Sequence, residues 1–346
     1  MKIKDRIIDD ASPAFVVAEL SANHNGKIGI ALDTVKAARD AGADAIKVQH
    51  YKPESLTIDS RNHFFRINQG TVWDGLTLFE LYSRACMPWE WTEQIFRTAG
   101  ECGLICFSSP FDQAAVDFLE TFDVPAYKIA SFEITDVPLV EYAAAKQKPI
   151  IVSTGVAELD DITEAMAACG RMGNHDVALL KCTSSYPAPL ESLNLNTIPD
   201  MKERFRSIVG LSDHTTGIAA PIASIALGAK IIEKHLILDR SLGGPDAVFS
   251  IEPKEFLSMT RAIRDVEKAL GSVVYELAAD ARKSRELSRS LFVVEDVEEG
   301  GVITTSNTRS IRPGYGLHPK LLTAVLGKKV KRKVTRGTPL TWDVLE

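Results

Sequence analysis

The sequence lacks the features that mark membrane-spanning, disulfide-stabilised and strongly nucleic-acid-binding proteins. No apolar run approaches the roughly 18 residues that a membrane-spanning helix needs, and the first residues show no signal-peptide pattern. The five cysteines are odd in number and include no Cys-x-x-Cys pair, so we interpret them as reduced thiols, several of them in the core. The formal net charge is −6. We expect a cytoplasmic protein with no membrane or nucleic-acid partner.

Charge is unevenly distributed along the 346 residues. From residue 282 onward the chain has 13 Lys and Arg against 7 Asp and Glu, which leaves 27 against 39 in the preceding part. This asymmetry indicates a separate C-terminal module. A basic module can bind nucleic acid, but docking on an acidic surface of the same protein explains the charge equally well.

Apolar segments alternate with helical patterns through most of the chain. The expected strands are residues 14–21, 44–49, 104–109, 126–131, 149–154, 177–183, 208–212 and 230–235. The expected helices are residues 28–41, 76–101 with a break at Pro88, 113–122, 137–146, 160–169, a segment around Met201, 219–227 and 254–270. Eight near-continuous apolar strands in strict alternation favour an α/β fold of the (β/α)8 TIM-barrel type over a doubly wound open sheet.

Two stretches depart from this alternation. Residues 50–75 have no clean period and are too long for a simple connection, so we expect a functional insertion at the barrel mouth. From Arg289 onward, short β-rich pieces are broken by glycine and proline. We therefore predict a barrel over residues 1–272, a linker over 273–288 and a small β-rich domain over 289–346.

Polar side chains gather where the expected strands end. They are Glu19, Lys47, Gln49, Ser108, Ser109, Lys128, Ser131, Glu133, Ser153, Thr154, Lys181, Thr183, Tyr186, Ser212, Asp213, His214, Glu233 and His235. Buried charges are costly unless they are paired, and enzymes of this fold do their chemistry at this end of the barrel. Three lysines with several hydroxyls favour a site for a strongly charged anion, and the glutamates suit proton transfer. The alternative is an internal salt-bridge network that binds no ligand.

His214 and His235 close two neighbouring expected strands that are separated by one crossover helix. Both imidazoles then lie at the same edge of the sheet and can share one metal ion, although two separately hydrogen-bonded histidines remain the alternative. A metal held by two histidines keeps open positions and can act as a Lewis acid. Nitrogen and oxygen ligands without a thiolate nearby in sequence favour Mn²⁺ or a similar divalent ion over structural zinc.

Several long motifs occur in a characteristic order. They are AELSANHNG at 18–26, GADAIKVQ at 42–49, FSSPF at 107–111, YKIASFE at 127–133, VSTG at 152–155, KCTSSYP at 181–187, GLSDHT at 210–215, IEKHL at 232–236 and SIRPGYGLHPK at 310–320. With these motifs the chain resembles the sialic acid synthase family, in which a phosphoenolpyruvate-condensing TIM barrel precedes an antifreeze-like (SAF) domain. The resemblance covers nearly the whole chain.

Details within the family resemble the pseudaminic acid synthase branch. These are AELSANHN itself, GTVWDG at 70–75 and LYSRACMPWEW at 81–91. The branch implies condensation of phosphoenolpyruvate with 6-deoxy-2,4-diacetamido-altrose (6-deoxy-AltdiNAc) and water, which releases phosphate and forms a bacterial surface and flagellar sugar. The alternatives are an N,N'-diacetyllegionaminic or N-acetylneuraminic acid synthase, and a sugar-binding or nucleic-acid-binding protein with an inactive barrel.

The resemblance also implies roles for individual residues. His214 and His235 are metal ligands, with Mn²⁺ expected and Mg²⁺ or Co²⁺ as alternatives, and Glu19 or Glu133 handles protons. The candidate substrate-binding residues are Lys47, Gln49, Ser109, Lys128, Ser131, Ser153, Lys181, Ser184, Tyr186, Ser212, Glu233, Asp246 and Arg312. Ser184 departs from the asparagine usual in the family, which affects one phosphate contact. Arg312 matches an SAF arginine that reaches the other subunit's site, so the family implies a domain-swapped homodimer.

Overall fold

The structure is a computed structural model that describes residues 1–68 and 70–346. The chain divides into two compact units, Met1–Gly271 and Ser272–Glu346, and each unit is described by itself. The division predicted from the sequence additionally separates a linker over residues 273–288 from the C-terminal domain.

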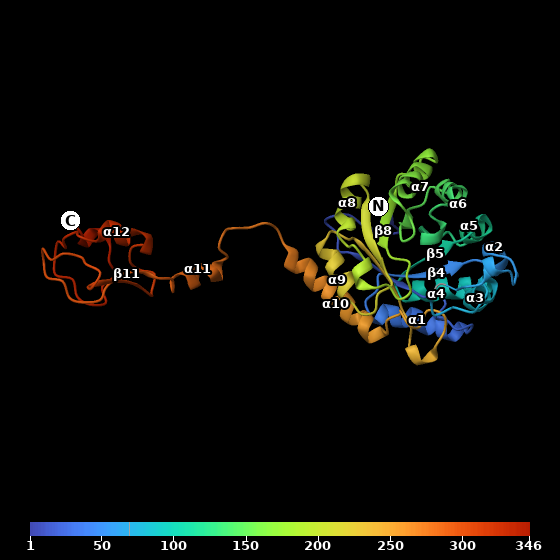
Figure 1. The fold of residues 1–346 in the computed structure, drawn as a ribbon, viewed down its shortest axis with the longest axis horizontal. Coiled ribbons are helices and arrows are strands. Elements are labelled where there is room, and N and C mark those ends of the chain that lie inside the picture. Colours follow the sequence, from blue (N-terminus) through green and yellow to red (C-terminus); the bar gives the residue numbers. More distant parts are fainter. Residues whose placement is uncertain (69) are drawn as a thin grey trace. The chain divides into compact units, whose positions relative to one another are not determined.

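Eight parallel strands of the first unit form a closed barrel (Figure 1). In chain order they are β3 (Phe15–Glu19), β4 (Ala45–His50), β5 (Ile105–Pro110), β6 (Tyr127–Ile129), β7 (Ile150–Ser153), β8 (Val177–Cys182), β9 (Ile208–Asp213) and β10 (Ile231–His235). Each strand pairs with the next along the chain, and β10 closes the barrel by pairing with β3. The predicted TIM barrel is confirmed, and the open-sheet alternative is wrong.

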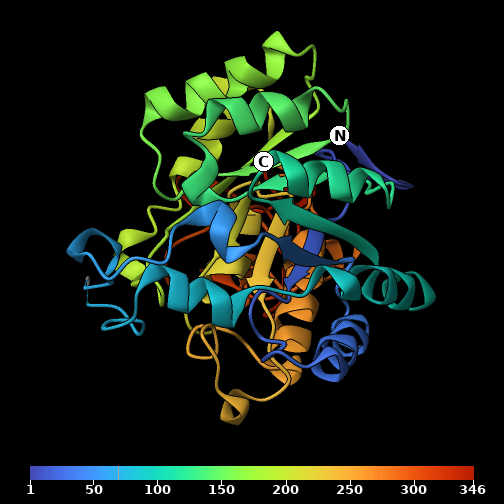
Figure 2. The ribbon, with the colours of Figure 1, turned by 90° about the vertical axis from the view of Figure 1, so that its right-hand side faces the viewer.

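Helices connect successive strands and surround the barrel, because parallel neighbours require a crossover (Figure 2). They are α1 (Ile28–Asp40), α2 (Pro53–Leu56), α3 (Leu78–Ala85), α4 (Thr92–Glu101), α5 (Gln113–Glu120), α6 (Val137–Ala144), α7 (Leu159–Arg171), α8 (Thr197–Phe205), α9 (Ala219–Ala226) and α10 (Pro253–Leu270). Thr77 and Glu80 form a capping box at the start of α3. Pro88 lies between α3 and α4, where the sequence predicts a break in the helix.

Inside the barrel, the two-residue alternation of each strand separates an apolar layer from a polar one. The inner apolar cluster includes Phe15, Val17, Ala45, Phe107, Ala126, Ile151, Leu180 and Ile231. The residues two positions further along the chain are mostly polar, and they are Glu19, Lys47, Ser109, Lys128, Ser153, Cys182 and Glu233. The carboxyl ends of the strands therefore present a polar layer directly above an apolar one.

A short antiparallel hairpin precedes the barrel, formed by β1 (Lys2–Ile3) and β2 (Arg6–Ile7). Ile3 and Ile8 are fully buried and belong to the inner apolar cluster. The hairpin therefore closes the amino-terminal end of the barrel.

The C-terminal unit contains α11 (Ala279–Arg285), β11 (Ser290–Val293), β12 (Thr308–Ile311) and α12 (Leu322–Val325). β11 and β12 pair antiparallel, and isolated bridges connect the remaining extended segments. Its separate core includes Leu291, Val293, Ile303, Val330 and Leu340. Among the described residues of both units, we find no helix with the length and apolarity needed to cross a membrane.

Candidate active site

A cavity of about 660 Å³ lies at the carboxyl ends of the barrel strands. This volume is within the usual range for small-molecule sites. Most residues predicted as site residues line it, and these are Lys47, Gln49, Lys128, Ser131, Glu133, Ser153, Ser184, Tyr186, Ser212, His214, Glu233, His235 and Asp246. The fold thus collects residues from many strand ends around one space.

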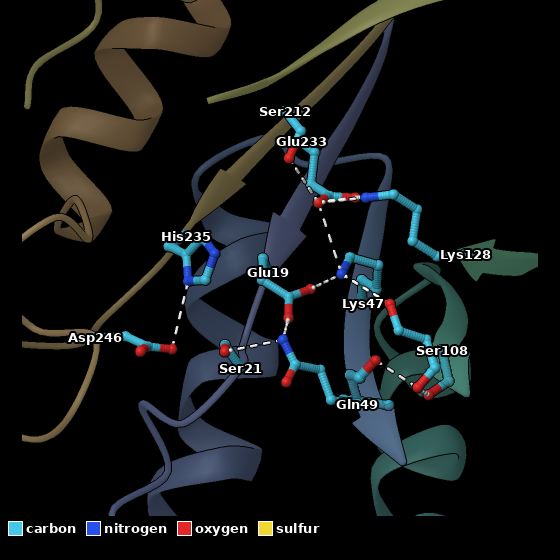
Figure 3. Close-up of polar contacts among 12 residues, drawn as sticks. Glu19, Ser21, Lys47, Gln49, Ser108, Lys128, Ser212, Glu233, His235 and Asp246 are labelled. Carbon is cyan, nitrogen blue, oxygen red and sulfur yellow. Dashed lines mark hydrogen bonds and ion pairs between the residues drawn. The ribbon is translucent and has the colours of Figure 1, made fainter. Parts of the chain in front are cut away.

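Two lysines and two glutamates form a continuous chain of ion pairs at the floor of this cavity (Figure 3). Nζ of Lys47 lies 2.8 Å from Oε2 of Glu19 and 3.6 Å from Oε1 of Glu233. Nζ of Lys128 lies 2.7 Å from the same Oε1, to which the Ser212 hydroxyl donates at 3.1 Å. The two positive and two negative charges balance, and their pairing offsets the free-energy cost of burying them. Because Lys47, Lys128 and Glu233 also line the cavity, this internal network is open to a ligand.

Burial and pairing together set the protonation of this network. Burial acts to raise the pKa of Glu233, but Lys128 and Lys47 lower it to about 2. Burial raises the pKa of Glu19 even though Lys47 lies beside it. Burial acts to lower the pKa of Lys47, but Glu19 and Glu233 raise it overall. Glu233 therefore stays ionised, and Glu19 is the carboxyl of this network that takes up a proton more readily.

His214 and His235 face each other with ring centroids 5.2 Å apart. Nδ1 of His235 is buried without a hydrogen-bond partner among the described residues and lies 3.6 Å from Oδ2 of Asp246. Nδ1 of His214 lies 3.1 Å from the carbonyl oxygen of Thr183. Burial, together with the nearby His214, lowers the pKa of His235 well below its ordinary value, so this imidazole is neutral. Neutral imidazole is the form that binds metal ions. His214 differs: burial acts to lower its pKa, but the nearby Cys182 raises it overall.

These residues fit a divalent ion held by two imidazole nitrogens. Within the described ranges, no group of three or more His, Cys, Asp or Glu side chains is arranged to hold a metal. A metal ion held by two imidazole ligands alone would keep coordination positions for water and substrate oxygen, as an open catalytic site requires.

Serine hydroxyls converge around the loop that follows β7. The Ser131 hydroxyl accepts from the backbone N–H of Val156 at 3.0 Å, and the buried Ser153 hydroxyl has no partner among the described residues. A Cβ atom on Gly155 would lie 2.2 Å from Oγ of Ser184 and 2.8 Å from Oγ of Ser131. The absence of a side chain at Gly155 therefore makes room for a cluster of hydroxyls, which suits a phosphate group.

Glu133 lies in the 3₁₀ turn after β6 and lines the cavity. Its Oε2 atom is buried without a hydrogen-bond partner among the described residues. Burial raises the pKa of Glu133 to about 7. A carboxyl group that titrates near neutral pH is suited to general acid–base catalysis.

The turn at residues 21–26, within the AELSANHNG motif, holds the β10–α10 loop in place. The Asn25 side chain donates to the carbonyl oxygen of Gly243 at 3.0 Å. The backbone N–H of Ala22 donates to Oδ2 of Asp246 at 3.2 Å. This turn thereby fixes a carboxylate beside His235.

One predicted site residue needs correction. Lys181 is absent from the cavity lining among the described residues, and its Nζ donates to the carbonyl oxygen of Cys182 at 2.8 Å. Leu180 belongs to the inner apolar cluster and Cys182 lines the cavity, so the alternation of β8 directs Lys181 to the opposite face. The predicted trio of site lysines is therefore a pair.

Three other predicted site residues are not among the described residues that line the cavity. Glu19 and Ser109 are fully buried and contact the cavity through Lys47, which lies 3.2 Å from Oγ of Ser109. Arg312 belongs to the C-terminal unit, next to β12. Its role stays a prediction.

Sequence reasoning missed several residues that the fold brings to the cavity. Cys182 lines it, with Sγ 3.9 Å from Nδ1 of His214, and all five cysteines are free. Phe249 packs against His235 with ring centroids 5.0 Å apart, and Trp73 reaches the cavity from the insertion. Of these residues, only Trp73 lies in a stretch that the sequence marks as functional, because residues 50–75 show no hydrophobic period.

Comparison with known proteins agrees with this architecture. Residues 34–275 match the NeuB family, and residues 288–346 match the SAF domain. The chain is 45% identical to a pseudaminic acid synthase from Campylobacter jejuni, across 94% of this chain and 95% of that protein. It is 43% identical to a pseudaminic acid synthase from Helicobacter pylori, across 96% and 98%.

A solved structure shows the same fold with another named activity. The N-acetylneuraminic acid (sialic acid) synthetase from Leptospira borgpetersenii aligns with a TM-score of 0.73 at 30% identity, over 82% of this chain and 94% of that chain. These matches do not support the alternative of a binding protein with an inactive barrel. The chain belongs to the NeuB family of sugar synthases, which are transferases, and it ends in an SAF domain.

Proposed function

We propose that this chain is a pseudaminic acid synthase that condenses phosphoenolpyruvate with 6-deoxy-AltdiNAc and water. The products are pseudaminic acid and phosphate. The observation that carries the reaction type is a pair of facing histidines beside a balanced Lys–Glu floor in a single cavity. The identities of 45% and 43% to pseudaminic acid synthases support the choice of acceptor.

Phosphoenolpyruvate would bind above the charged floor. Lys47 and Lys128 would offer ammonium donors to the anion, although Glu19 and Glu233 balance their charge. The hydroxyls of Ser131, Ser153 and Ser184 would add donors for the phosphate group. Glu233 and Ser212 hold Lys128 in position. Because the phosphate charge is present throughout the reaction, the two lysines act mainly on binding.

The acceptor would lie between the histidines and the outer part of the cavity. His214 and His235 would hold a divalent ion, for which we propose Mn²⁺, with Mg²⁺ or Co²⁺ as alternatives. When bound, such an ion supplies Lewis-acid polarisation of the sugar aldehyde. Tyr186, Asp246 and Gln49 then position the sugar chain.

The bond-forming step joins C3 of phosphoenolpyruvate to the aldehyde carbon. Water adds at C2, and the tetrahedral intermediate expels phosphate by cleavage of the C–O bond. We assign proton transfer to Glu133, whose pKa lies near neutrality, with Glu19 as the alternative.

The assembly that completes this site would be a domain-swapped homodimer. In it, the partner subunit's Arg312 reaches the cavity. We also propose that the reaction takes place in the cytoplasm, since five free cysteines fit a reducing compartment, and that the product serves flagellin glycosylation.

Phosphate release tests the proposed function directly. The protein is incubated with phosphoenolpyruvate, Mn²⁺ and one sugar at a time: 6-deoxy-AltdiNAc, the corresponding legionaminate precursor, or N-acetylmannosamine. We expect release with 6-deoxy-AltdiNAc. Turnover of N-acetylmannosamine without turnover of 6-deoxy-AltdiNAc would show that the acceptor is wrong.

A further inference from the structure

The cavity has two chemically distinct regions. Its floor is charged, as the Lys–Glu chain shows, whereas its outer wall is mainly apolar. Residues of that wall include Tyr51, Phe64, Ile67, Trp73, Leu81 and Phe249. Most of them come from the segment between β4 and α3 or from α3 itself. Arg66 and Thr71 of the same segment also line the cavity, so its outer wall is mainly, not wholly, apolar. A small molecule in this cavity therefore meets the Lys–Glu chain at one end and a largely hydrocarbon wall at the other.

Trp73 connects the outer wall to the residues around the histidines. The centroid of its indole ring lies 5.5 Å from the ring centroid of Tyr186. It lies 6.4 Å from the ring centroid of Phe249, in an edge-to-face arrangement. Those two rings in turn pack against the histidines. The ring centroids are 4.4 Å apart for Tyr186 and His214 and 5.0 Å apart for Phe249 and His235. Tyr186 and Phe249 thus lie between Trp73 and the histidines.

The orientation of Trp73 is fixed by a hydrogen bond. Its Nε1–H donates to the carbonyl oxygen of Pro245 at 2.9 Å, so the polar edge of the indole is satisfied. The ring is half-buried and lines the cavity, which leaves apolar surface available to a ligand. A hydroxyl group pressed against this surface would lose hydrogen bonds to water, whereas a methyl group would gain apolar contact.

We propose that Trp73 is a specificity-determining residue that selects a methyl group over a hydroxymethyl group at the end of the acceptor remote from its aldehyde. This inference rests on the proposed function. With the aldehyde at the histidines, the far end of an open-chain six-carbon sugar extends toward the wall that Trp73 forms. The wall therefore favours a 6-deoxy sugar.

The test compares two acceptors that differ only at C6, 6-deoxy-AltdiNAc and its 6-hydroxy analogue. Kinetics are measured for the full-length wild-type chain, W73A, W73H and W73F with phosphoenolpyruvate and Mn²⁺. We expect W73A and W73H to lower the preference for the 6-deoxy sugar about tenfold or more, the scale of one apolar group in a pocket. The KM for phosphoenolpyruvate should stay within about twofold of wild type, since the floor is unchanged. W73F keeps an apolar ring and should retain most of the preference.

Val72→Ala is the matched control, because Val72 is the exposed neighbour of Trp73 and is not among the described residues that line the cavity. Wild-type preference in V72A supports the proposal. Unchanged preference in both W73A and W73H, or an equal loss in V72A, would overturn it. If W73A fails to unfold cooperatively, W73H against W73F decides. A wild-type protein that turns over neither sugar would instead contradict the proposed function.

Discussion

Nζ of Lys128 lies 2.7 Å from Oε1 of Glu233, and both side chains are almost completely buried. Both groups line the cavity but expose very little of their surface, so each charge depends mainly on its protein partners. Breaking such a pair leaves one buried charge uncompensated, and this costs more than the pair itself contributes.

Glu233→Gln should therefore lower the free energy of unfolding by about 3–5 kcal/mol. Urea titration of the full-length protein measures this change. Asp200→Asn is a suitable control, since Asp200 forms an exposed ion pair with Arg204 on α8 and should cost about 1 kcal/mol or less. Removing both charges together, with K128M and E233L, should restore part of the loss. Equal losses for E233Q and D200N would contradict the structural role.

Gly155→Ala should impair phosphoenolpyruvate binding. The new Cβ would meet Oγ of Ser184 at 2.2 Å and Oγ of Ser131 at 2.8 Å, so the hydroxyl cluster has to move. We expect the KM for phosphoenolpyruvate to rise at least about tenfold, the scale of one lost charge-assisted hydrogen bond. Gly100→Ala in α4 is the control, because nothing lies within 4 Å of its Cβ position. An unchanged KM in G155A would show that the cluster does not bind the phosphate.

Glu133 should make stability fall as pH rises. Its pKa in the folded chain is about 7, against an ordinary value of 4.5, so the folded state holds a proton that the unfolded state has lost between these values. Stability from this group is complete below pH 4.5 and is lost as pH rises through 7. The advantage of wild type over E133Q should shrink by up to about 3 kcal/mol across that interval. Urea titrations at several pH values measure it, and a difference independent of pH would contradict the raised pKa.

His235→Ala should abolish metal-dependent turnover while the barrel stays folded, because His235 lies at the end of β10 and its Nδ1 is not a partner in any hydrogen bond among the described residues. Circular dichroism checks the fold, and phosphate release checks activity. Wild-type protein treated with chelator should lose activity in the same way and regain it when Mn²⁺ is added. Full turnover in chelator would refute the Lewis-acid role.

Arg312→Ala should be rescued by a subunit with the opposite defect. If the partner subunit's Arg312 completes each site, a heterodimer of R312A and H235A chains contains one site with both residues intact. Mixing the two inactive variants should then restore part of the activity, with each variant alone as the control. Activity that never exceeds the sum of the separate variants would argue against donation between subunits.

The barrel could be predicted because its parallel strands are covered on both sides and so appear as continuous apolar segments. Their order along the chain also places His214 directly after β9 and His235 at the end of the neighbouring strand β10. Continuous apolar segments do not show which face of the strand each residue occupies. Lys181 lies one residue from Cys182, and only the observed strand shows that Cys182, not Lys181, faces the cavity.

Residues outside the strands were harder to predict for a different reason. Trp73 and Phe249 are 176 positions apart in the chain, and their contact depends on how two long loops fold over the barrel mouth. Neither loop has a period that indicates its path. The Asn25 side chain, likewise, acts through carbonyl groups of a distant loop, which no local pattern reveals.

The wall that carries Trp73 and the floor that carries Lys128 come from separate parts of the chain, one from a loop between strands and the other from the strands themselves. Loops accept substitution and insertion without loss of the barrel's backbone hydrogen bonds. Divergence can thus alter which sugar is elongated while the carbon–carbon bond-forming chemistry is inherited unchanged. The same separation makes the loop a natural unit for transplantation between relatives when a new acceptor is wanted.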